Sequence, residues 1–286
     1  MKHSISGKTR VCGIIGDPIE HTMSPAIHNA AFAKMGLDYV YIAFRVKPEE
    51  LDKAIKGVRA LNMRGLSVTI PHKVAVLKLL DKLDPLAEKI GAVNTIVNDD
   101  GVLTGYNTDA TGFLQAMLER GVEPKGKNIA ILGAGGASRA VSFILADRGA
   151  NLVILNRRLE LDWAVELARR ISQAFNRKVE ALELTRDNLI KALEKAEILV
   201  NATSVGMSPN SNETPVPSDL LRPGLIVYDI VYNPVKTKLL RDAEAAGAEI
   251  ISGVDMLVWQ GVMAFEKWTG KKPPVELMKK EAIKQL

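Results

Sequence analysis

The run Ser67-Val68-Thr69-Ile70-Pro71-His72-Lys73 places one ammonium group where an α/β protein often keeps a catalytic acid or base. A strand-like stretch from Leu66 to Ile70 ends at Pro71, and Lys73 follows shortly after it. Functional groups of α/β proteins gather at the carboxyl ends of strands, so Lys73 would lie at such an end beside the Thr69 hydroxyl. A lone lysine could equally be a surface residue that opens a helix. The further polar clusters and the glycine-rich loop that follow favour the functional interpretation.

The segment Gly133-Ala134-Gly135-Gly136-Ala137-Ser138-Arg139 has the pattern of a dinucleotide-binding loop. An apolar stretch precedes it and a helical pattern up to Arg148 follows it. Gly133 would allow the tight turn, and Gly135 would let the backbone approach a pyrophosphate at the amino end of the helix. Ser138 replaces the third glycine of the fingerprint and is small enough to keep helix packing close. The alternative is a tight strand-to-helix turn that binds no ligand.

The end of the next strand indicates which dinucleotide binds. NAD sites have an acidic residue there, which binds the ribose 2′-hydroxyl. This chain has Asn156-Arg157-Arg158, and its next carboxylate is Glu160. Guanidinium groups suit a 2′-phosphate, whereas the alternative is that both arginines are merely solvated. The sequence therefore predicts NADP as the cofactor.

The elements that must position these residues fall into two blocks, separated by a charged, turn-rich segment at 119–127. In the first block, Ser24-Pro25 is expected to cap and open a helix, and Thr108 or Asp109 is expected to cap another. Asn98-Asp99-Asp100-Gly101 is expected to form a hairpin turn. The expected strands are 10–16, 39–46, 66–70, 92–97 and 102–106, and residues 48–61 have the periodicity of an amphipathic helix.

The second block alternates short apolar stretches with helical patterns, which is the rhythm of a doubly wound parallel sheet. Its expected strands are 128–132, 151–155, 178–182, 198–201, 225–230 and 248–251. From about Asp255 to Leu286 the pattern is helical, with a break at Pro273-Pro274.

Composition limits the possible partners and the compartment. The 286 residues include 38 basic and 33 acidic side chains, spread along the chain, and 5% are aromatic, so we expect no nucleic-acid partner. The single cysteine, Cys12, excludes an intrachain disulfide and is expected to be a buried strand residue. No His/Asp/Glu cluster has ligand spacing, so no metal is expected. No apolar run approaches roughly 18 residues and the first residues lack an apolar core, so we expect a cytoplasmic protein without a membrane partner.

With these pieces in order, the chain resembles the shikimate dehydrogenase family over nearly its whole length. The resemblance depends on an ordered set of motifs, each of which could occur alone by chance. They are His21-Thr22-Met23-Ser24-Pro25, Val68 to Lys73, Gly91-Ala92-Val93-Asn94-Thr95, Gly105-Tyr106-Asn107-Thr108-Asp109, the Gly133 to Arg139 loop, Asn156-Arg157, Asn201-Ala202-Thr203-Ser204-Val205-Gly206-Met207, Tyr232-Asn233-Pro234, Gly253-Val254-Asp255-Met256-Leu257 and Gln260.

The resemblance implies roles for individual residues. Lys73 and Asp109 match the family's catalytic pair. The implied substrate-binding residues are Thr22, Ser24, Thr69, Lys73, Asn94, Asp109, Tyr232 and Gln260. The implied cofactor-binding residues are Gly133, Ala134, Gly135, Gly136, Ala137, Asn156, Arg157, Arg158, Thr203, Ser204, Met207, Ile230, Gly253 and Met256. The chain departs from the family at two of these positions, where Thr22 replaces a serine and Arg158 a threonine.

The resemblance also implies an architecture and a reaction. We expect an α/β substrate-binding and catalytic domain at 1–120, a Rossmann-type NADP-binding domain at 121–257, and C-terminal helices at 258–286 that return to the first domain. The implied activity is the NADP-dependent interconversion of 3-dehydroshikimate and shikimate, a step in aromatic amino acid biosynthesis. A dual-specificity quinate/shikimate dehydrogenase and a non-catalytic metabolite-sensing protein are the alternatives. Whether the protein forms a homodimer is left open.

Overall fold

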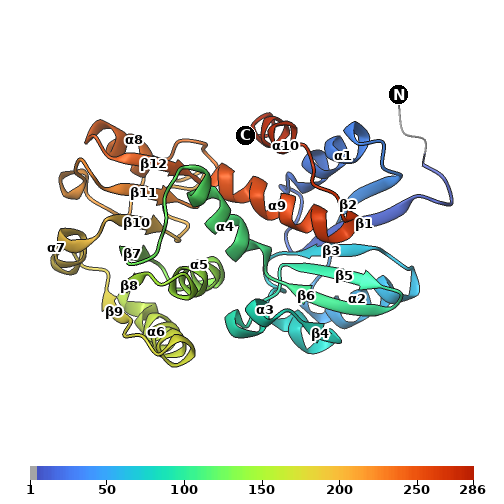
Figure 1. The fold of residues 1–286 in the computed structure, drawn as a ribbon, viewed down its shortest axis with the longest axis horizontal. Helices are drawn as coiled ribbons and strands as arrows, with labels where there is room; N and C mark the ends of the chain where they lie inside the picture. The colour runs from blue at the N-terminus through green and yellow to red at the C-terminus, as the bar shows by residue number, and fades with distance from the viewer. Residues whose placement is uncertain (1–4) are drawn as a thin grey trace. The chain divides into compact units, whose positions relative to one another are not determined.

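The computed structural model describes residues 5–286, and these form two compact units (Figure 1). The first unit contains residues 5–112 and 258–285, and the second is built from residues 113–257. The boundary falls within two helices, α4 (Thr108–Glu119) and α9 (Gly253–Thr269). The C-terminal helices thus return to the first unit, as predicted.

The first unit is built on a mixed six-stranded sheet with the order β2-β1-β3-β5-β6-β4. Strands β1, β2 and β3 are parallel, β5 pairs antiparallel with β3 and β6, and β4 is parallel to β6. The strands are β1 (Arg10–Gly16), β2 (Tyr39–Arg45), β3 (Gly65–Val68), β4 (Lys82–Leu83), β5 (Thr95–Asp99) and β6 (Val102–Tyr106). The helices, besides parts of α4 and α9, are α1 (Ser24–Lys34), η1 (Pro48–Glu50), α2 (Leu51–Ala60), η2 (Ala75–Leu79), α3 (Pro85–Ile90) and α10 (Val275–Ile283).

Helix starts in this unit differ from the sequence prediction at two places. Met23 is the N-cap of α1 and no side chain caps the helix, so Ser24 is already its first residue. The α4 cap also lies before the predicted residues, because Asn107 Oδ1 accepts a hydrogen bond from Ala110 N at 3.1 Å. Strand β4 and helix α3 had not been predicted, although α3 has a standard Asp84 cap that accepts from Leu86 N at 3.0 Å.

The hairpin between β5 and β6 follows the sequence prediction. Its two turn residues, Asp100 and Gly101, have φ values of 51° and 90°. Both left-handed conformations are those of a two-residue turn whose twist matches that of the flanking strands. The Asp-Gly pair therefore determines the register in which Asp99 pairs with Val102.

The second unit is an all-parallel sheet with the order β12-β11-β10-β7-β8-β9, which is the doubly wound arrangement predicted from the sequence. Its strands are β7 (Asn128–Leu132), β8 (Asn151–Asn156), β9 (Glu180–Glu183), β10 (Ile198–Asn201), β11 (Ile226–Asp229) and β12 (Glu249–Ser252). Its helices are α5 (Gly136–Asp147), η3 (Arg158–Glu160), α6 (Leu161–Phe175), α7 (Arg186–Lys195), η4 (Ser218–Leu220) and α8 (Lys238–Ala245). The strand order reverses between β7 and β10, and this is where ligands bind in such sheets.

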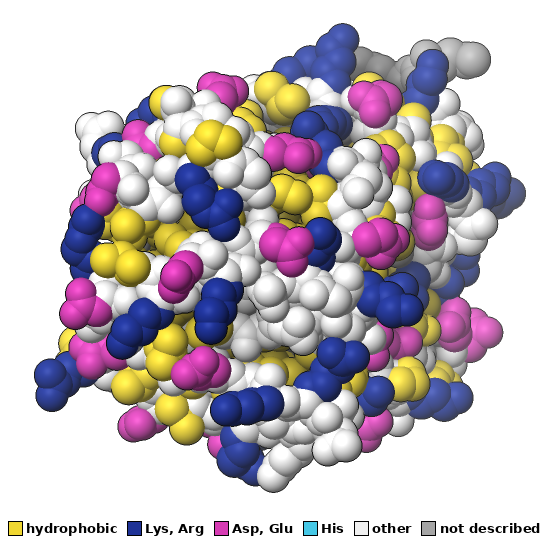
Figure 2. Space-filling model, turned by 60° about the vertical axis from the view of Figure 1, so that its left-hand side comes forward, with side chains coloured by type: hydrophobic (Ala, Val, Ile, Leu, Met, Phe, Trp, Pro, Cys, Tyr) yellow, Lys and Arg dark blue, Asp and Glu magenta, His cyan; other side chains and the backbone are white. Residues whose placement is uncertain are grey.

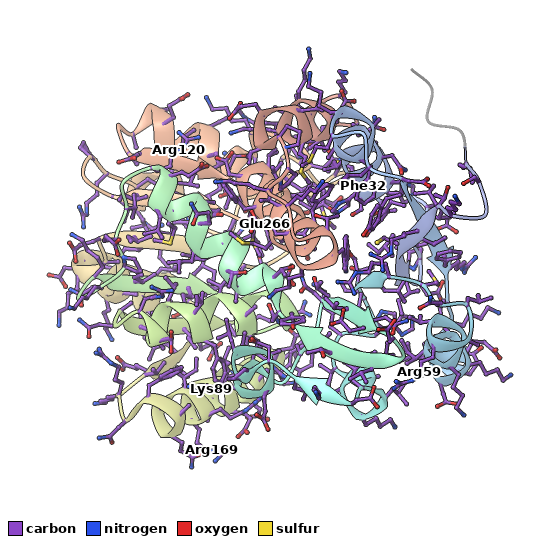
Figure 3. The ribbon with its side chains drawn as sticks, turned by 45° about the vertical axis from the view of Figure 1, so that its right-hand side comes forward. Phe32, Arg59, Lys89, Arg120, Arg169 and Glu266 are labelled. Atoms are coloured by element: carbon purple, nitrogen blue, oxygen red, sulfur yellow. The ribbon has the colours of Figure 1, made fainter. Side chains whose placement is uncertain are left out.

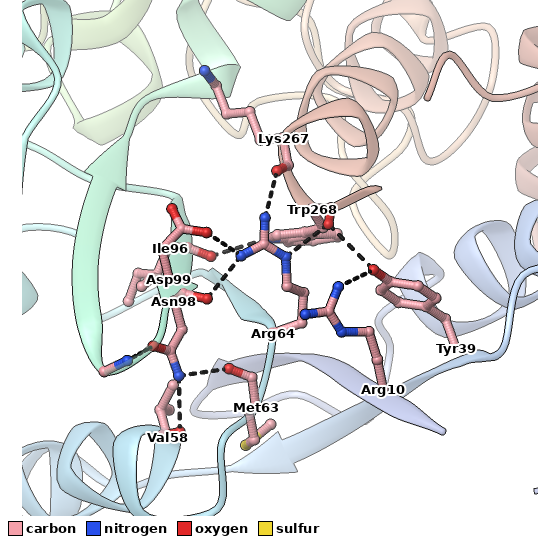
Figure 4. A network of polar contacts seen from close by, with 11 residues as sticks. Arg10, Tyr39, Val58, Met63, Arg64, Ile96, Asn98, Asp99, Lys267 and Trp268 are labelled. Carbon is pink, nitrogen blue, oxygen red and sulfur yellow. Dashed lines mark hydrogen bonds and ion pairs between the residues drawn. The ribbon is translucent and has the colours of Figure 1, made fainter. Parts of the chain in front are cut away.

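Helix α9 is fastened to the first unit by its last turn. Trp268 Nε1 donates to Ile96 O at 2.9 Å, and Arg64 Nε donates to Trp268 O at 2.7 Å (Figure 4). Gly65 leaves the space for the indole, since a Cβ there would lie 2.3 Å from Trp268 Nε1. On the same face of the helix, Phe32 of α1 stacks on Phe265 with ring centroids 4.8 Å apart, and Figure 3 shows Phe32 beside α9.

The surface carries charges of both signs, as the nearly balanced numbers of basic and acidic residues predict. Over the face drawn in Figure 2, basic and acidic side chains are interspersed. Among the described residues, no helix is long and apolar enough to cross a membrane. Cys12 is fully buried in β1, and burial raises the pKa of its thiol to about 12.

Candidate active site

Lys73 lies just beyond the carboxyl end of β3, in a segment that backbone hydrogen bonds hold at two points. Thr69 N donates to Ile15 O at 3.0 Å, which keeps this segment beside the end of β1. Val93 N donates to Lys73 O at 2.8 Å, which fixes the lysine backbone beside the segment that leads into β5. The adjacent His72 is buried and its Nε2 lies 2.6 Å from Val46 O, so it is a structural residue.

Lys73 and Asp109 form a partly shielded ion pair. Lys73 Nζ donates to Asp109 Oδ2 at 2.7 Å, and the two side chains are 22% and 12% exposed. Asp109 lies in the first turn of α4, where the helix dipole favours a negative charge. Two residues 36 positions apart, with η2, β4, α3 and the β5–β6 hairpin between them, are thus brought into contact, and such a pair can take up or release a proton.

Asn94 is oriented by the start of the same helix. Its Oδ1 accepts hydrogen bonds from Thr108 N at 2.7 Å and from Thr108 Oγ1 at 3.1 Å, and the residue is 3% exposed. Thr95 Oγ1 donates to the same oxygen at 3.1 Å. Because Oδ1 is saturated by these donors, the Asn94 amide nitrogen is the group left to bind another acceptor.

Gln260 of α9 approaches the site through close backbone packing. A Cβ on Gly112 would lie 2.5 Å from Gln260 N, so only glycine allows α4 and α9 to come this close. Gly112 follows Asp109 by one helical turn, and residues at this spacing share a helix face. The contact therefore brings Gln260 to the part of α4 that carries Asp109.

Thr22 and Ser24 lie where the loop after β1 enters α1. Ser24 N donates to Thr22 Oγ1 at 3.4 Å, and Ser24 is 8% exposed. The buried Tyr41 hydroxyl donates to Ser67 Oγ at 2.7 Å. Burial raises the pKa of Tyr41, and side-chain hydrogen bonds with Ser67 and Ser24 oppose the rise. The sequence prediction missed Tyr41, although a tyrosine between two apolar strand residues is a signal for a buried hydroxyl contact.

Tyr232 is the one predicted substrate residue in the second unit. It is 37% exposed and lies in the loop after β11. The other seven all belong to the first unit.

The predicted cofactor residues gather along one edge of the second sheet. Because all six strands are parallel, their carboxyl ends lie at the same edge, and every predicted cofactor residue lies at or just after such an end. The groups are Gly133–Ala137 after β7, Asn156–Arg158 at the end of β8, Thr203, Ser204 and Met207 after β10, Ile230 after β11, and Gly253 and Met256 after β12.

The glycine loop has the open shape that a pyrophosphate requires. Gly133 has φ of +97°, which a glycine adopts without strain. Nothing lies within 4 Å of a Cβ built on Gly135 or Gly136, so the amino end of α5 is open above the loop. Ser138 Oγ donates to Gly133 O at 2.6 Å, so the residue that replaces the third glycine closes the turn itself. The chain thus offers free space and helix N–H groups for a phosphate.

The arginines after β8 are exposed cations beside a fixed asparagine. Asn156 Nδ2 donates to Glu160 O at 2.7 Å, which closes the loop. Arg157 pairs with the Glu160 carboxylate, and this contact raises the pKa of the guanidinium further. Arg158 is exposed. These residues fit the 2′-phosphate of NADP better than a ribose hydroxyl.

The chain is also similar to known proteins in sequence and in structure. The family model described as "Shikimate dehydrogenase substrate binding domain" matches residues 14–96, and the one described as "Shikimate 5'-dehydrogenase C-terminal domain" matches residues 253–283. A shikimate dehydrogenase (NADP(+)) of Methanopyrus kandleri is 49% identical over 285 residues, which are 99% of this chain and 98% of the relative. The chain belongs to the shikimate dehydrogenase family.

Solved members of the shikimate dehydrogenase family have the same fold. The enzyme from Listeria monocytogenes, in complex with shikimate and NAD, has a TM-score of 0.94 and 45% identity, with 98% of each chain covered. The enzyme from Thermus thermophilus, in complex with NADP(H) and shikimate, has a TM-score of 0.87 and 38% identity, with 97% of this chain and 100% of that one covered. A quinate dehydrogenase from Corynebacterium glutamicum, in complex with NAD, has a TM-score of 0.88 and 32% identity, with 96% and 98% covered.

Proposed function

We propose that this protein catalyses the NADP-dependent interconversion of 3-dehydroshikimate and shikimate. The observation that carries the proposal is the 2.7 Å Lys73–Asp109 pair. The same unit also holds hydroxyl and amide side chains suited to a hydroxylated carboxylate. The 49% sequence identity to a shikimate dehydrogenase over 99% of this chain supports it. In this assignment residues 5–112 and 258–285 bind the substrate, and residues 113–257 bind NADP.

Oxidation of a ring alcohol removes a hydride and a hydroxyl proton. The nicotinamide of bound NADP⁺ supplies the hydride acceptor. Lys73 and Asp109 take up the hydroxyl proton and return it in the reverse direction. The two groups are in hydrogen-bond contact, so the proton is taken up by the pair.

The remaining substrate contacts are those that the family resemblance implies, and the chemistry of the residues suits them. Thr22 and Ser24 hold the carboxylate through their hydroxyl groups. Thr69, Gln260 and the free amide nitrogen of Asn94 bind ring hydroxyls, and Tyr232 is a further proposed substrate residue. The cofactor is held by the Gly133–Ala137 loop, by Asn156, Arg157 and Arg158, and by Thr203, Ser204, Met207, Ile230, Gly253 and Met256.

A turnover assay tests the proposal. The protein is given shikimate or quinate with NADP⁺ or NAD⁺, and the reduced cofactor is followed by absorbance. We expect shikimate with NADP⁺ to have the highest kcat/KM. Comparable turnover of quinate would instead support the dual-specificity alternative, and binding of shikimate without any turnover would support a metabolite sensor.

A further inference from the structure

Asp229 is a buried carboxylate that the proposed catalytic scheme does not use. It is the last residue of β11 and is fully buried. Its Oδ1 accepts from Asn201 Nδ2 at 2.9 Å and from Val231 N at 3.0 Å, and its Oδ2 accepts from Thr237 Oγ1 at 2.6 Å. A buried carboxylate costs folding free energy unless it is fully hydrogen-bonded, and here three donors converge on it.

One of these donors continues into the loop after β10. Asn201 Oδ1 accepts from Thr203 N at 3.1 Å and from Thr203 Oγ1 at 2.7 Å. Thr203 Oγ1 in turn accepts from Val205 N at 3.2 Å. A chain of hydrogen bonds therefore runs from Asp229 through Asn201 to Thr203, and it fixes the backbone of this loop.

Thr203 lies at the reversal of strand order. A Cβ on Gly133 would lie 3.0 Å from Thr203 Cγ2, so the loops after β7 and β10 are in contact. The other two donors, Val231 and Thr237, flank the loop after β11. Asp229 thus connects the loop that carries Thr203 and Ser204 with the one that carries Ile230 and Tyr232.

A doubly wound sheet binds one mononucleotide with each of its two halves, so with the adenosine half at β7, β8 and β9 the nicotinamide half lies at β10, β11 and β12. We infer that Asp229 is a positioning residue for the nicotinamide half of the cofactor, which it serves through Asn201 and Thr203. The inference rests on the proposed use of NADP. The adenosine half with its 2′-phosphate would contact the arginines after β8, which lie outside this chain of hydrogen bonds. The structure therefore predicts that loss of the Asp229 contacts weakens the binding of whole NADP⁺ and spares the adenosine half.

The chain provides a control for the loss of a helix cap. Thr237 caps α8 by accepting from Leu240 N at 3.3 Å, and Thr185 caps α7 by accepting from Asn188 N at 3.3 Å. Only the Thr237 hydroxyl also donates to Asp229. Thr237→Val and Thr185→Val therefore each remove a helix cap, but only Thr237→Val also removes a contact with Asp229. Thr237→Ser retains the cap and the Asp229 contact.

The experiment measures the Kd of NADP⁺ and of adenosine 2′,5′-bisphosphate by titration calorimetry on the full chain. We expect Asp229→Asn and Thr237→Val to raise the Kd of NADP⁺ by about tenfold, with Thr237→Ser and Thr185→Val near the wild type. The Kd of adenosine 2′,5′-bisphosphate should not change in any variant. The double variant Asn201→Ala/Asp229→Asn should bind NADP⁺ no more weakly than Asn201→Ala alone, because Asp229 acts on the cofactor through Asn201.

Two results would overturn the inference. The first is that Asp229→Asn and Thr237→Val bind NADP⁺ with the same Kd as Thr185→Val. The other is an equal loss of affinity for adenosine 2′,5′-bisphosphate, which would mean general damage to the second unit. Both are binding measurements, so they decide the inference even if the wild type fails to oxidise shikimate, a failure that would count against the proposed function alone.

Discussion

Lys73 Nζ lies 2.7 Å from Asp109 Oδ2, and each side chain is mostly shielded from water. Lys73→Ala removes the ammonium of this pair and should lower kcat by about 10²–10⁴-fold, the usual contribution of a positioned acid or base. The Kd of NADP⁺ should stay close to that of the wild type. Lys78→Ala, which alters an exposed lysine of η2, is the control. A near-normal kcat in Lys73→Ala would contradict the catalytic assignment.

The arginines after β8 should select the phosphorylated cofactor. A hydrogen bond to a charged group is worth roughly 1.5–3 kcal/mol, so replacing Arg157 and Arg158 by alanine should raise the KM for NADP⁺ at least about tenfold. The KM for NAD⁺ should change little. Arg157 is partly engaged by Glu160, so Glu160→Gln should leave NADP⁺ binding intact or improve it. Equal use of NAD⁺ and NADP⁺ by the wild type would rule out this account.

Thr22 should discriminate against quinate. Quinate has an extra hydroxyl on the carbon that bears the carboxylate, close to the proposed contacts of Thr22 and Ser24. The threonine methyl is stiff and offers that hydroxyl no partner, and a buried unsatisfied hydroxyl costs roughly 1–3 kcal/mol. Thr22→Ser should therefore raise kcat/KM for quinate relative to shikimate. An unchanged ratio would show that the methyl is not the discriminating group.

Asp229 should make stability depend on pH in a defined direction. Burial raises the pKa of its carboxyl from 3.8 to about 6, against the opposing hydrogen bonds from Thr237, Val231 and Asn201. Because the folded-state pKa is the higher one, the stability it contributes is complete below about pH 3.8 and is lost as the pH rises through about 6. The unfolding free energy of the wild type minus that of Asp229→Asn should fall by about 3 kcal/mol over this interval. Urea unfolding of both proteins at several pH values measures it, and a flat difference would contradict the assignment.

Two glycines of the first unit should respond oppositely to alanine. A Cβ at Gly65 would lie 2.3 Å from Trp268 Nε1 and 2.4 Å from Ile96 O, so Gly65→Ala should lower the unfolding free energy by about 1–3 kcal/mol or more. Gly57 lies within α2 with nothing within 4 Å of its Cβ position, so Gly57→Ala should raise it by about 0.4–1 kcal/mol. Thermal unfolding of the two variants checks both signs. Destabilisation by Gly57→Ala equal to that by Gly65→Ala would refute the packing argument.

Local patterns in the sequence determined most of the secondary structure. Neighbouring residues determine the Asp100-Gly101 turn, the strand before Gly133 and the glycine loop, because turn conformations and strand periodicity are local properties. The strands at Arg10–Gly16, Val102–Tyr106 and Asn128–Leu132 have the predicted bounds. The helix caps were less predictable, since Met23 and Asn107 take positions that neighbouring serine, threonine or aspartate residues could also have taken.

The ordered motifs also indicated which residues matter, but only the tertiary structure decided how they meet. That Asn94 uses its oxygen on Thr108 and keeps its nitrogen free depends on contacts between segments that are distant in the chain. The approach of Gln260 to α4 depends on the missing side chain of Gly112, and the role of Tyr41 on its burial beside Ser67. The contact of Asn201 with Asp229 follows from the parallel pairing of β10 and β11, which no local pattern encodes. Packing determines which side chains meet across a fold. The sequence therefore indicates the candidate functional residues, and the folded chain determines what each of them contacts.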